Sequence, residues 1–189
     1  GGRHMYLMKA ESPGPSVSKL VPRVKQTARI LYAIYLVMTI VEIVLLLLGG
    51  MPAFDTVTLS MGTAGTGGFG IRNDSVGSYT PYMQNVITIF MILFGVNFNI
   101  YYLFLCKKWK QALHSEELKM YFGVIAAAIL LITFNVRSFF PSVLEAFQQA
   151  AFQVASIMTS TGYSTTDFGQ WPIFSQTLLL TLMFIGACA

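Results

Sequence analysis

The chain has 189 residues, of which 54% are hydrophobic, 14% aromatic and only 11% charged. Soluble domains carry about 25% charged residues, so eight acidic and twelve basic side chains are too few to coat a soluble globule of this length. This composition excludes a cytosolic enzyme, a disordered chain and a secreted disulfide scaffold, and it points to membrane spans. Cys106 and Cys188 form no CxxC pair, and we interpret them as small apolar side chains within helices.

The N-terminal segment, residues 1–29, is polar and holds six basic residues against a single acid. The sequence SPGP at 12–15 interrupts any helix, because proline fixes φ and drives the preceding residue to an extended conformation. Beyond it, apolar residues recur at helical spacing at Leu20, Val24 and Ala28. We therefore predict a cytoplasmic linker that ends in an amphipathic helix at the membrane surface.

The next part of the chain reads as a membrane hairpin. Residues 30–48 are apolar and long enough to span a bilayer, with one charge at Glu42. Residues 52–64 are moderately apolar and too short to span, and they meet the glycine-rich run GTGGFG at 65–70. Residues 81–106 carry no charge, and this apolar run predicts a second span.

The same order returns after a basic cytoplasmic loop at 107–119. Residues 120–136 predict a third span. Residues 141–158 have a helical pattern, although three Gln and one Glu suit them poorly to lipid. They meet a Ser/Thr/Gly turn at 159–165, after which the apolar residues 171–189 begin a fourth span.

The two turns align at an offset of 94 residues, the distance from Gly68 to Gly162. The same offset places the two short helices opposite each other, and internal repetition determines architecture. We predict an all-α membrane protein of tandem span–re-entrant pore helix–span repeats, potassium-channel-like and incomplete. The repeats would occupy 30–106 and 120–189.

Non-helical backbone at membrane depth is tolerated only inside protein or along a water-filled path. Glycine and small hydroxyl residues let carbonyls point into a narrow pore, where carbonyl rings replace the water shell of a cation. The C-terminal, partly negative ends of the short helices would stabilise that cation. Asp55 and Glu145 lie near the starts of these helices, and we interpret them as structural acids, with ion binding as the alternative.

Four runs carry a family resemblance: AESPGP at 10–15, GTGGFG at 65–70, GVNFNIYY at 95–102 and STGYSTTDF at 160–168. Together they resemble the Trk/Ktr/HKT superfamily of potassium transporters, in particular its bacterial TrkH-like membrane subunits. The resemblance implies four tandem repeats around one pore. This chain would then be a fragment that holds the second repeat and most of the third, with GGRHM as native sequence.

The resemblance also assigns a selectivity filter that binds K⁺, carried over by position. Its residues are Thr66, Gly67, Gly68, Phe69, Ser160, Thr161, Gly162 and Tyr163. Each repeat would contribute one key glycine to that filter, here Gly68 and Gly162. In plant relatives a serine at one repeat's glycine position goes with sodium preference, so these two glycines favour K⁺, although the first repeat's position is outside this chain.

The family further implies inward K⁺ uptake with no cofactor, and with H⁺ or Na⁺ as candidate coupled ions. Its partners would be the lipid bilayer, a second copy in a homodimer and a TrkA-like cytosolic nucleotide-binding regulatory subunit, with no nucleic acid. Ten of the twelve Lys and Arg lie in 1–29 and 107–119, so the positive-inside rule places both segments in the cytoplasm of a bacterial plasma (inner) membrane and the filters outside.

Several alternatives stay open. The chain could be a non-conducting membrane assembly subunit or a Na⁺-permeable member of the superfamily. We expect no enzyme activity and no transition-metal site, since His4 and His114 lack ligand-spaced partners. For Glu42 we favour a hydrogen bond between helices over ion relay. For the two asparagines of the GVNFN run, we favour helix contact over lining of an inner cavity.

Overall fold

The computed structural model describes residues 24–105 and 107–186. Every regular element within them is a helix, which confirms the predicted all-α class. Most of the predicted interfacial helix, residue 106 and the chain end at 187–189 lie outside the described residues.

The first group of helices begins with α2, Val24–Leu48, so the last residues assigned to the linker belong to a long helix. It is followed by the short α3, Ala53–Ala64, and by α4, Pro81–Phe94. Thr80 caps α4 by accepting a hydrogen bond from the Met83 amide at 3.4 Å, and proline stands at the first helical position, where its missing N–H costs nothing.

The predicted single span at 81–106 is broken. Helix α4 ends at Phe94 and α5, Phe98–Leu105, leaves it at an angle of 87°. Gly95 ends α4, and the Asn97 side chain accepts a hydrogen bond from the Asn99 amide at 3.0 Å, an N-cap contact that starts a new helix. Local capping therefore overrides the continuous apolar pattern.

The second group follows the short α6, Trp109–Leu113. Helix α7 spans Glu116–Val136 and α8 spans Val143–Met158, where Ser142 accepts a hydrogen bond from the Glu145 amide as N-cap. The last described helix is α9, Ile173–Gly186. The 3₁₀ turns Arg137–Phe139 and Phe168–Gln170 complete the described elements of this part.

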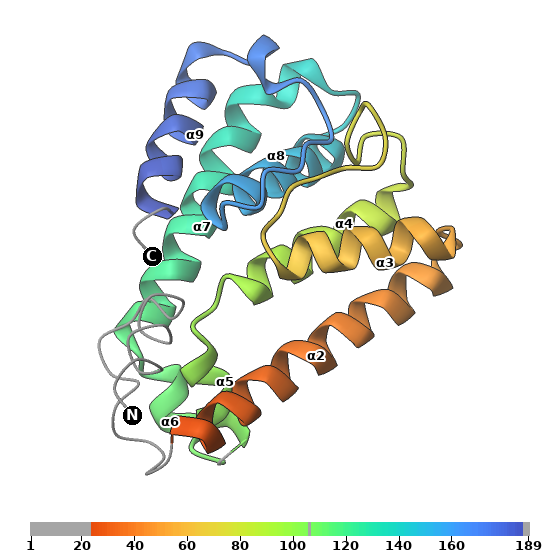
Figure 1. Ribbon diagram of the computed structural model, residues 1–189. Helices are drawn as coiled ribbons and strands as arrows, with labels where there is room; N and C mark the ends of the chain where they lie inside the picture. Colours follow the sequence, from red (N-terminus) through yellow and green to blue (C-terminus); the bar gives the residue numbers. More distant parts are fainter. Residues whose placement is uncertain (1–23, 106, 187–189) are drawn as a thin grey trace.

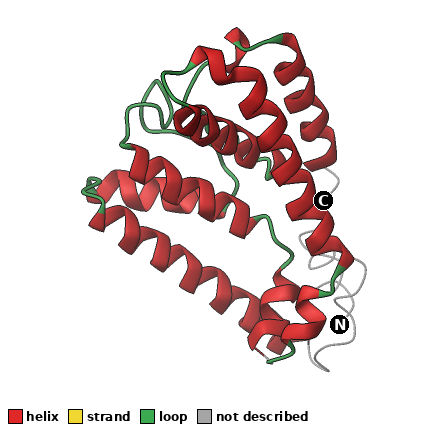
Figure 2. Cartoon of the chain, turned by 180° about the vertical axis from the view of Figure 1, so that it is seen from behind, coloured by secondary structure: helices red, strands yellow, loops and turns green. Residues whose placement is uncertain are grey.

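The helices pack as two groups. Helix α2 packs against α3 and α4, α7 packs against α8 and α9, and α8 also packs against α4 (Figures 1 and 2). Each group has its own core of buried apolar residues, and the first core also includes Phe152 and Ala155 from α8. Helix α8 thus belongs to the second group and also packs into the core of the first.

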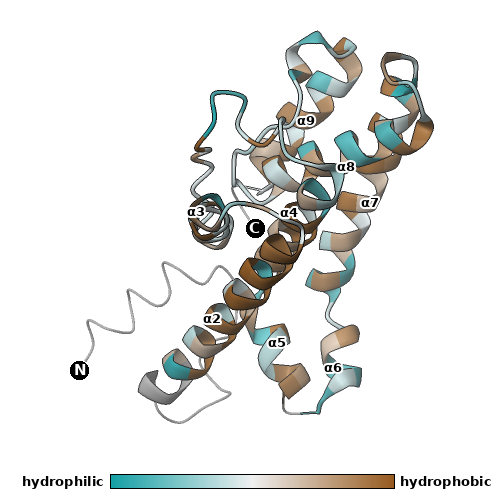
Figure 3. Ribbon diagram, turned by 90° about the vertical axis from the view of Figure 1, so that its right-hand side faces the viewer, coloured by the Kyte–Doolittle hydropathy of each residue, from teal (hydrophilic) through white to brown (hydrophobic). Residues whose placement is uncertain are grey.

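Two helices are long and apolar enough to cross a membrane, Ala28–Leu48 and Glu116–Phe139. The bent pair of α4 and α5 would make a third, and α9 is apolar but shorter. Figure 3 shows strongly hydrophobic residues along α2, consistent with a lipid-facing surface. By length and composition, the described residues thus hold two helices that could cross a membrane, or three if the bent pair is one span; the fourth predicted span, 171–189, is described only to residue 186 and stays a prediction.

Candidate functional site

The two turns that follow α3 and α8 have the same backbone structure. Their helices end 94 residues apart, at Ala64 and Met158. Three amide-to-carbonyl hydrogen bonds then recur at equivalent positions: Gly65 to Met61 at 2.9 Å and Thr159 to Ala155 at 3.0 Å; Thr66 to Thr63 at 3.2 Å and Ser160 to Ile157 at 3.1 Å; Gly67 to Gly62 at 2.7 Å and Thr161 to Ser156 at 2.9 Å.

The turns also share their unusual backbone angles. Thr66 and Ser160 occupy equivalent positions with φ of 48° and 56°, although neither is glycine. Gly68 and Gly162 follow two residues later with φ of 66° and 89°. Residues other than glycine rarely adopt positive φ, and β-branched ones such as threonine least of all, so Thr66 and Ser160 mark local strain that the surrounding structure has to maintain.

The two turns touch each other at their glycines. A Cβ built on Gly68 would collide with the Thr161 carbonyl oxygen and would lie 3.2 Å from the Gly162 Cα. A Cβ on Gly162 would meet only the Gly68 Cα, at 3.8 Å. The structure therefore brings together Gly68, Thr161 and Gly162, and only the first of these glycines is closely confined.

The segments just beyond the turns are joined as well. The Val76 amide donates to the Ser164 carbonyl at 3.0 Å, and the Ser164 amide donates to the Ser75 hydroxyl at 3.2 Å. These bonds connect residues almost 90 positions apart in the chain. They fix the second turn on the loop of the first.

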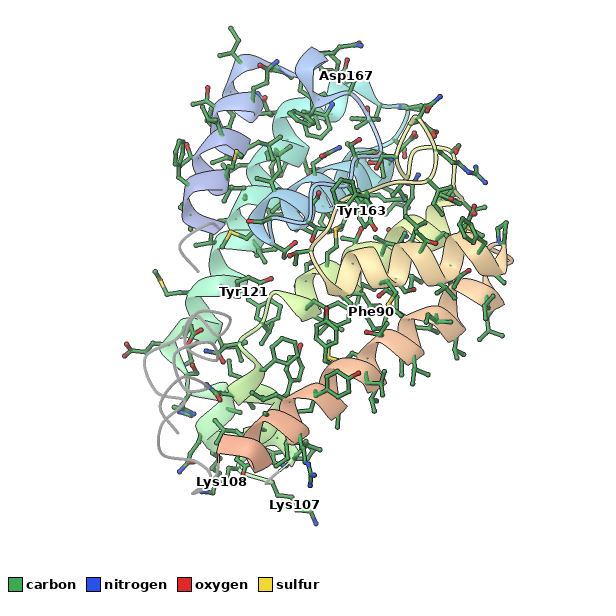
Figure 4. The ribbon with its side chains drawn as sticks, viewed as in Figure 1. Phe90, Lys107, Lys108, Tyr121, Tyr163 and Asp167 are labelled. Atoms are coloured by element: carbon green, nitrogen blue, oxygen red, sulfur yellow. The ribbon has the colours of Figure 1, made fainter. Side chains whose placement is uncertain are left out.

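The aromatic residues of the two turns have opposite surroundings. Tyr163 is only 1% exposed, and its hydroxyl donates to the Leu59 carbonyl on α3 at 3.1 Å (Figure 4). It lies over Gly62, where a Cβ would collide with the hydroxyl. Phe69, the equivalent residue of the first turn, is 83% exposed. The structure thus brings Tyr163 onto the neighbouring helix and leaves Phe69 uncovered.

The polar face of α8 holds the second turn, a role that the sequence reasoning missed. The Ser156 hydroxyl donates to the Tyr163 carbonyl at 2.6 Å, and Gln153 donates to the Thr166 carbonyl at 3.2 Å. Gln149 accepts a hydrogen bond from the Thr165 hydroxyl. The three α8 residues are spaced by four and three positions and so share one helix face. The glutamines, which suit lipid poorly, are the feature of the sequence that could have indicated this role.

At the first short helix, an acid contacts the loop that follows the turn. Asp55, which aligns with Gln149, accepts a hydrogen bond from the Tyr79 hydroxyl at 2.8 Å and lies 3.7 Å from the Arg72 guanidinium. That guanidinium also lies 4.1 Å from the centre of the Tyr79 ring. Burial, together with the bond to Asp55, raises the pKa of Tyr79 to about 12, so the phenol stays a protonated donor at neutral pH. These contacts support the structural interpretation of Asp55.

A cavity of about 600 Å³ lies beside both turns and the α4–α5 break. Thr66 and Thr159 line it from the turns, and Asn97, Glu117 and Gly186 line it from the surrounding helices. The Asn97 amide also donates to the Glu117 carboxylate at 3.1 Å. Asn97 therefore contacts a neighbouring helix, as favoured, and also lines a cavity, which was the alternative.

Glu42 is fully buried in α2. Its carboxyl lies within reach of the Thr63 hydroxyl, but neither oxygen makes a hydrogen bond of ordinary geometry. The hydrogen bond that we favoured for Glu42 thus lacks ordinary geometry. Its alternative role in ion relay stays a prediction. The hydroxyl of Ser60, on α3, is likewise buried without a hydrogen-bond partner.

Comparison with known proteins gives a consistent result. A protein-family model described as TrkH, cation transport protein, matches residues 1–189. The Trk system potassium uptake protein TrkH of Salmonella typhimurium is 34% identical over 194 residues, which cover 100% of this chain and 40% of that protein. The corresponding TrkG of Escherichia coli is 30% identical over 192 residues, covering 100% of this chain and 39% of that protein.

Among solved structures, the crystal structure of the potassium transporter TrkH from Vibrio parahaemolyticus superposes with a TM-score of 0.75 and 27% sequence identity. The match covers 88% of this chain and 37% of that one. The chain therefore spans about 40% of the length of the curated relatives it matches. These relatives are transport proteins and not enzymes, as the sequence indicated.

Proposed function

Because the chain belongs to the TrkH family of cation transport proteins, we propose that it supplies two adjacent repeats of a four-repeat potassium uptake protein. Each repeat consists of a span, a re-entrant pore helix and a second span. In this proposal α3 and α8 are the pore helices, and the turns after them form two walls of the selectivity filter. The observation that carries the proposal is the shared backbone of these turns and their contact at Gly68.

The backbone angles support a carbonyl-lined path. Successive carbonyls of an ordinary strand alternate in direction, because the strand is pleated. Positive φ at every second residue of each turn breaks this alternation, and we propose that neighbouring carbonyls thereby face one side. Such a row can replace the hydration shell of a dehydrated K⁺ ion. Strain at the non-glycine residues Thr66 and Ser160 fits a functional origin.

The ion would then pass into the cavity beside the turns. Its lining combines the hydroxyls of Thr66 and Thr159 with Asn97 and Glu117, all of which offer oxygen atoms to a hard cation. The ends of α3 and α8 point their partly negative carboxyl termini at the turns, which favours a cation there. Outside the turns, the Asp55–Arg72 pair is satisfied and stays out of the path.

Replacement of each glycine by serine in the full-length protein tests the filter. We expect Gly68→Ser and Gly162→Ser to weaken the preference for K⁺ over Na⁺, since a side chain at either position disturbs the carbonyl row. The measurements are growth under K⁺ limitation and uptake of Rb⁺ against Na⁺. Gly123→Ser is the matched control, because a Cβ at this helical glycine has open space. Unchanged growth and unchanged preference in both variants would refute the filter.

The two alternative functions predict different experimental results. A non-conducting assembly subunit would tolerate bulky residues throughout 65–70 and 160–165, whereas a Na⁺-permeable member would show the reverse ion preference in the same uptake assay. The homodimer, the TrkA-like cytosolic partner, the coupled H⁺ or Na⁺ and the bacterial inner membrane stay predictions from the family.

A further inference from the structure

A groove of about 700 Å³ lies between α2 and the bent pair of α4 and α5. Its walls are mainly apolar side chains from all three helices, among them Ile30, Ala33, Val37, Leu93, Phe104 and Leu105. Tyr101 also lines it, but its hydroxyl already donates to the Leu93 carbonyl at 2.7 Å. Val37 and Leu105 are 59% and 65% exposed, so the groove is open to the surroundings. It therefore suits an apolar chain that enters from outside.

The groove has about the depth of one membrane leaflet. Its α2 residues run from Ile30 to Met38, which corresponds to about 12 Å along the helix. One leaflet contributes about 15 Å to the hydrocarbon core of a bilayer. Beyond the end of the groove at Ile30 and Leu105, which we call its mouth, Trp109 is 59% exposed and contacts the Phe104 ring edge-on. Exposed tryptophan lies at the level of the lipid head groups, which places the mouth near that level.

Three bases flank the mouth of the groove. Arg29 precedes Ile30 on α2, and Lys107 and Lys108 follow Leu105 of α5; Figure 4 shows both lysines at the end of the molecule where α2 starts. All three are exposed, and residues 28–38 and 98–113 contain no Asp or Glu. Among the described residues, none of the three bases forms a salt bridge. The mouth thus presents positive charge to a ligand.

The backbone holds Lys107 in an unfavourable conformation. Its amide donates to the Phe104 carbonyl and the Lys108 amide donates to the Leu103 carbonyl, both at 3.0 Å. These two bonds form the Schellman motif that ends many helices, and Lys107 occupies its left-handed position with φ of 57°. Glycine is usual there, because an L side chain disfavours this conformation. Local stability therefore does not account for a lysine at this position.

We propose that the groove binds an acyl chain of an anionic phospholipid whose phosphate is held by Arg29, Lys107 and Lys108. Such a lipid matches both properties of the site, positive charge at the mouth and an apolar interior. Basic pockets between spans on the cytoplasmic side, to which the bases assign this end, are typical of anionic lipid sites. The inference is independent of the filter, since none of these residues lines the cavity beside the turns.

Native mass spectrometry of the full-length protein tests the head-group contact. The delipidated protein is titrated with phosphatidylglycerol and, separately, with phosphatidylcholine of the same acyl chains. We expect Lys107→Gly and Lys108→Ala each to weaken binding of phosphatidylglycerol about fivefold, the effect of removing one base near an anionic lipid, and to leave phosphatidylcholine binding unchanged. Lys119→Ala, which removes an exposed base of α7, is the matched control. Equal phosphatidylglycerol binding in the wild type and both variants would overturn the proposal.

Lys107→Gly also separates lipid binding from a structural role. Glycine suits the left-handed position, so the unfolding temperature of the delipidated variant should stay level or rise. Added phosphatidylglycerol should then raise that temperature less than it does in the wild type, because a ligand stabilises the folded state according to its affinity. A lysine that serves only the fold would give a lower unfolding temperature and an undiminished response to the lipid, which contradicts the proposal.

The acyl-chain contact is tested by filling the groove. Ala33→Trp should abolish the preferred binding of phosphatidylglycerol, since Ala33 lines the groove. Leu36→Trp is the matched control, because Leu36 is exposed on α2 outside the groove lining. In native membranes, benzoylphenylalanine at position 33 should form cross-links to lipid. Cross-links to a second copy or to another segment of the same protein, or unchanged lipid binding in Ala33→Trp, would show that lipid does not occupy the groove.

Discussion

At the scale of single residues, the two glycines at the contact between the turns are not equivalent. Both have positive φ, which an L-amino acid adopts at a cost of roughly 1–2 kcal/mol. Only Gly68 also faces backbone at close range, because the Thr161 carbonyl and the Gly162 Cα leave no room for a Cβ. A Cβ on Gly162 would make only an ordinary contact, with the Gly68 Cα at 3.8 Å. The strain of a substitution should therefore differ between the two positions.

We predict that Gly68→Ala destabilises the full-length protein more than Gly162→Ala does. Gly162→Ala loses about 1–2 kcal/mol from its backbone angle alone. Gly68→Ala carries the same backbone cost, and its methyl group must also displace the second turn at the Thr161 carbonyl. Thermal unfolding in detergent, followed by size-exclusion chromatography, measures both. Gly123→Ala is the control and should be neutral or slightly stabilising, since its site is helical and open. Equal loss in both variants would contradict the observed contact.

At the scale of elements, the two short helices hold their turns by different chemistry. On α8 the side chains of Gln149, Gln153 and Ser156 bind the turn from within the same repeat. On α3 the equivalent positions are Asp55, Leu59 and Gly62, and two of these have no side-chain hydrogen bond to offer. Asp55 contacts Tyr79 and Arg72 in the loop after the first turn. Leu59 and Gly62 lie against Tyr163 of the second turn. The two turns thus share a backbone conformation, but different side-chain contacts surround them.

We predict that Ser156→Ala changes ion preference as well as stability. It leaves the buried Tyr163 carbonyl without its hydroxyl donor, a loss of about 1–3 kcal/mol. Ser175→Ala is the matched control. Its hydroxyl donates to the Asn135 side chain at 2.7 Å, away from the turns. Both variants should lower the unfolding temperature, but only Ser156→Ala should reduce the preference for Rb⁺ over Na⁺ in uptake. An equal shift of preference in both would contradict this role.

The sequence predicts where the two short helices α3 and α8 end, because glycine and threonine follow their last apolar residues, Ala64 and Met158. It does not predict the break after Phe94. The apolar pattern continues across it, and the competing signal is a single Asn97 cap. Nor does the sequence separate Phe69 from Tyr163, since only packing between repeats buries one and leaves the other exposed. Periodicity reports local structure, whereas these features depend on distant contacts.

At the scale of the whole molecule, charge is sorted between its two ends. Figure 4 shows Lys107 and Lys108 at one end and Asp167 at the other, with Tyr163 between them. The described bases of α2, α6 and the start of α7 gather at the lysine end, whereas Arg72 and Arg137 belong to the loops near the turns. The positive-inside rule then orients the lysine end toward the cytoplasm.

We predict that a membrane-impermeant maleimide labels Asp167→Cys, but not Lys108→Cys, from outside intact cells, in a background with Cys106→Ser and Cys188→Ser. Lys108→Cys should react only after the membrane is permeabilised, which controls for a thiol that is buried rather than internal. Both positions are exposed in the structure, so accessibility reports the side of the membrane. The reverse pattern would invert the topology and place the turns at the cytoplasmic face. Incoming K⁺ would then meet the cavity before the filter, which contradicts the proposed placement of the filter at the outer side.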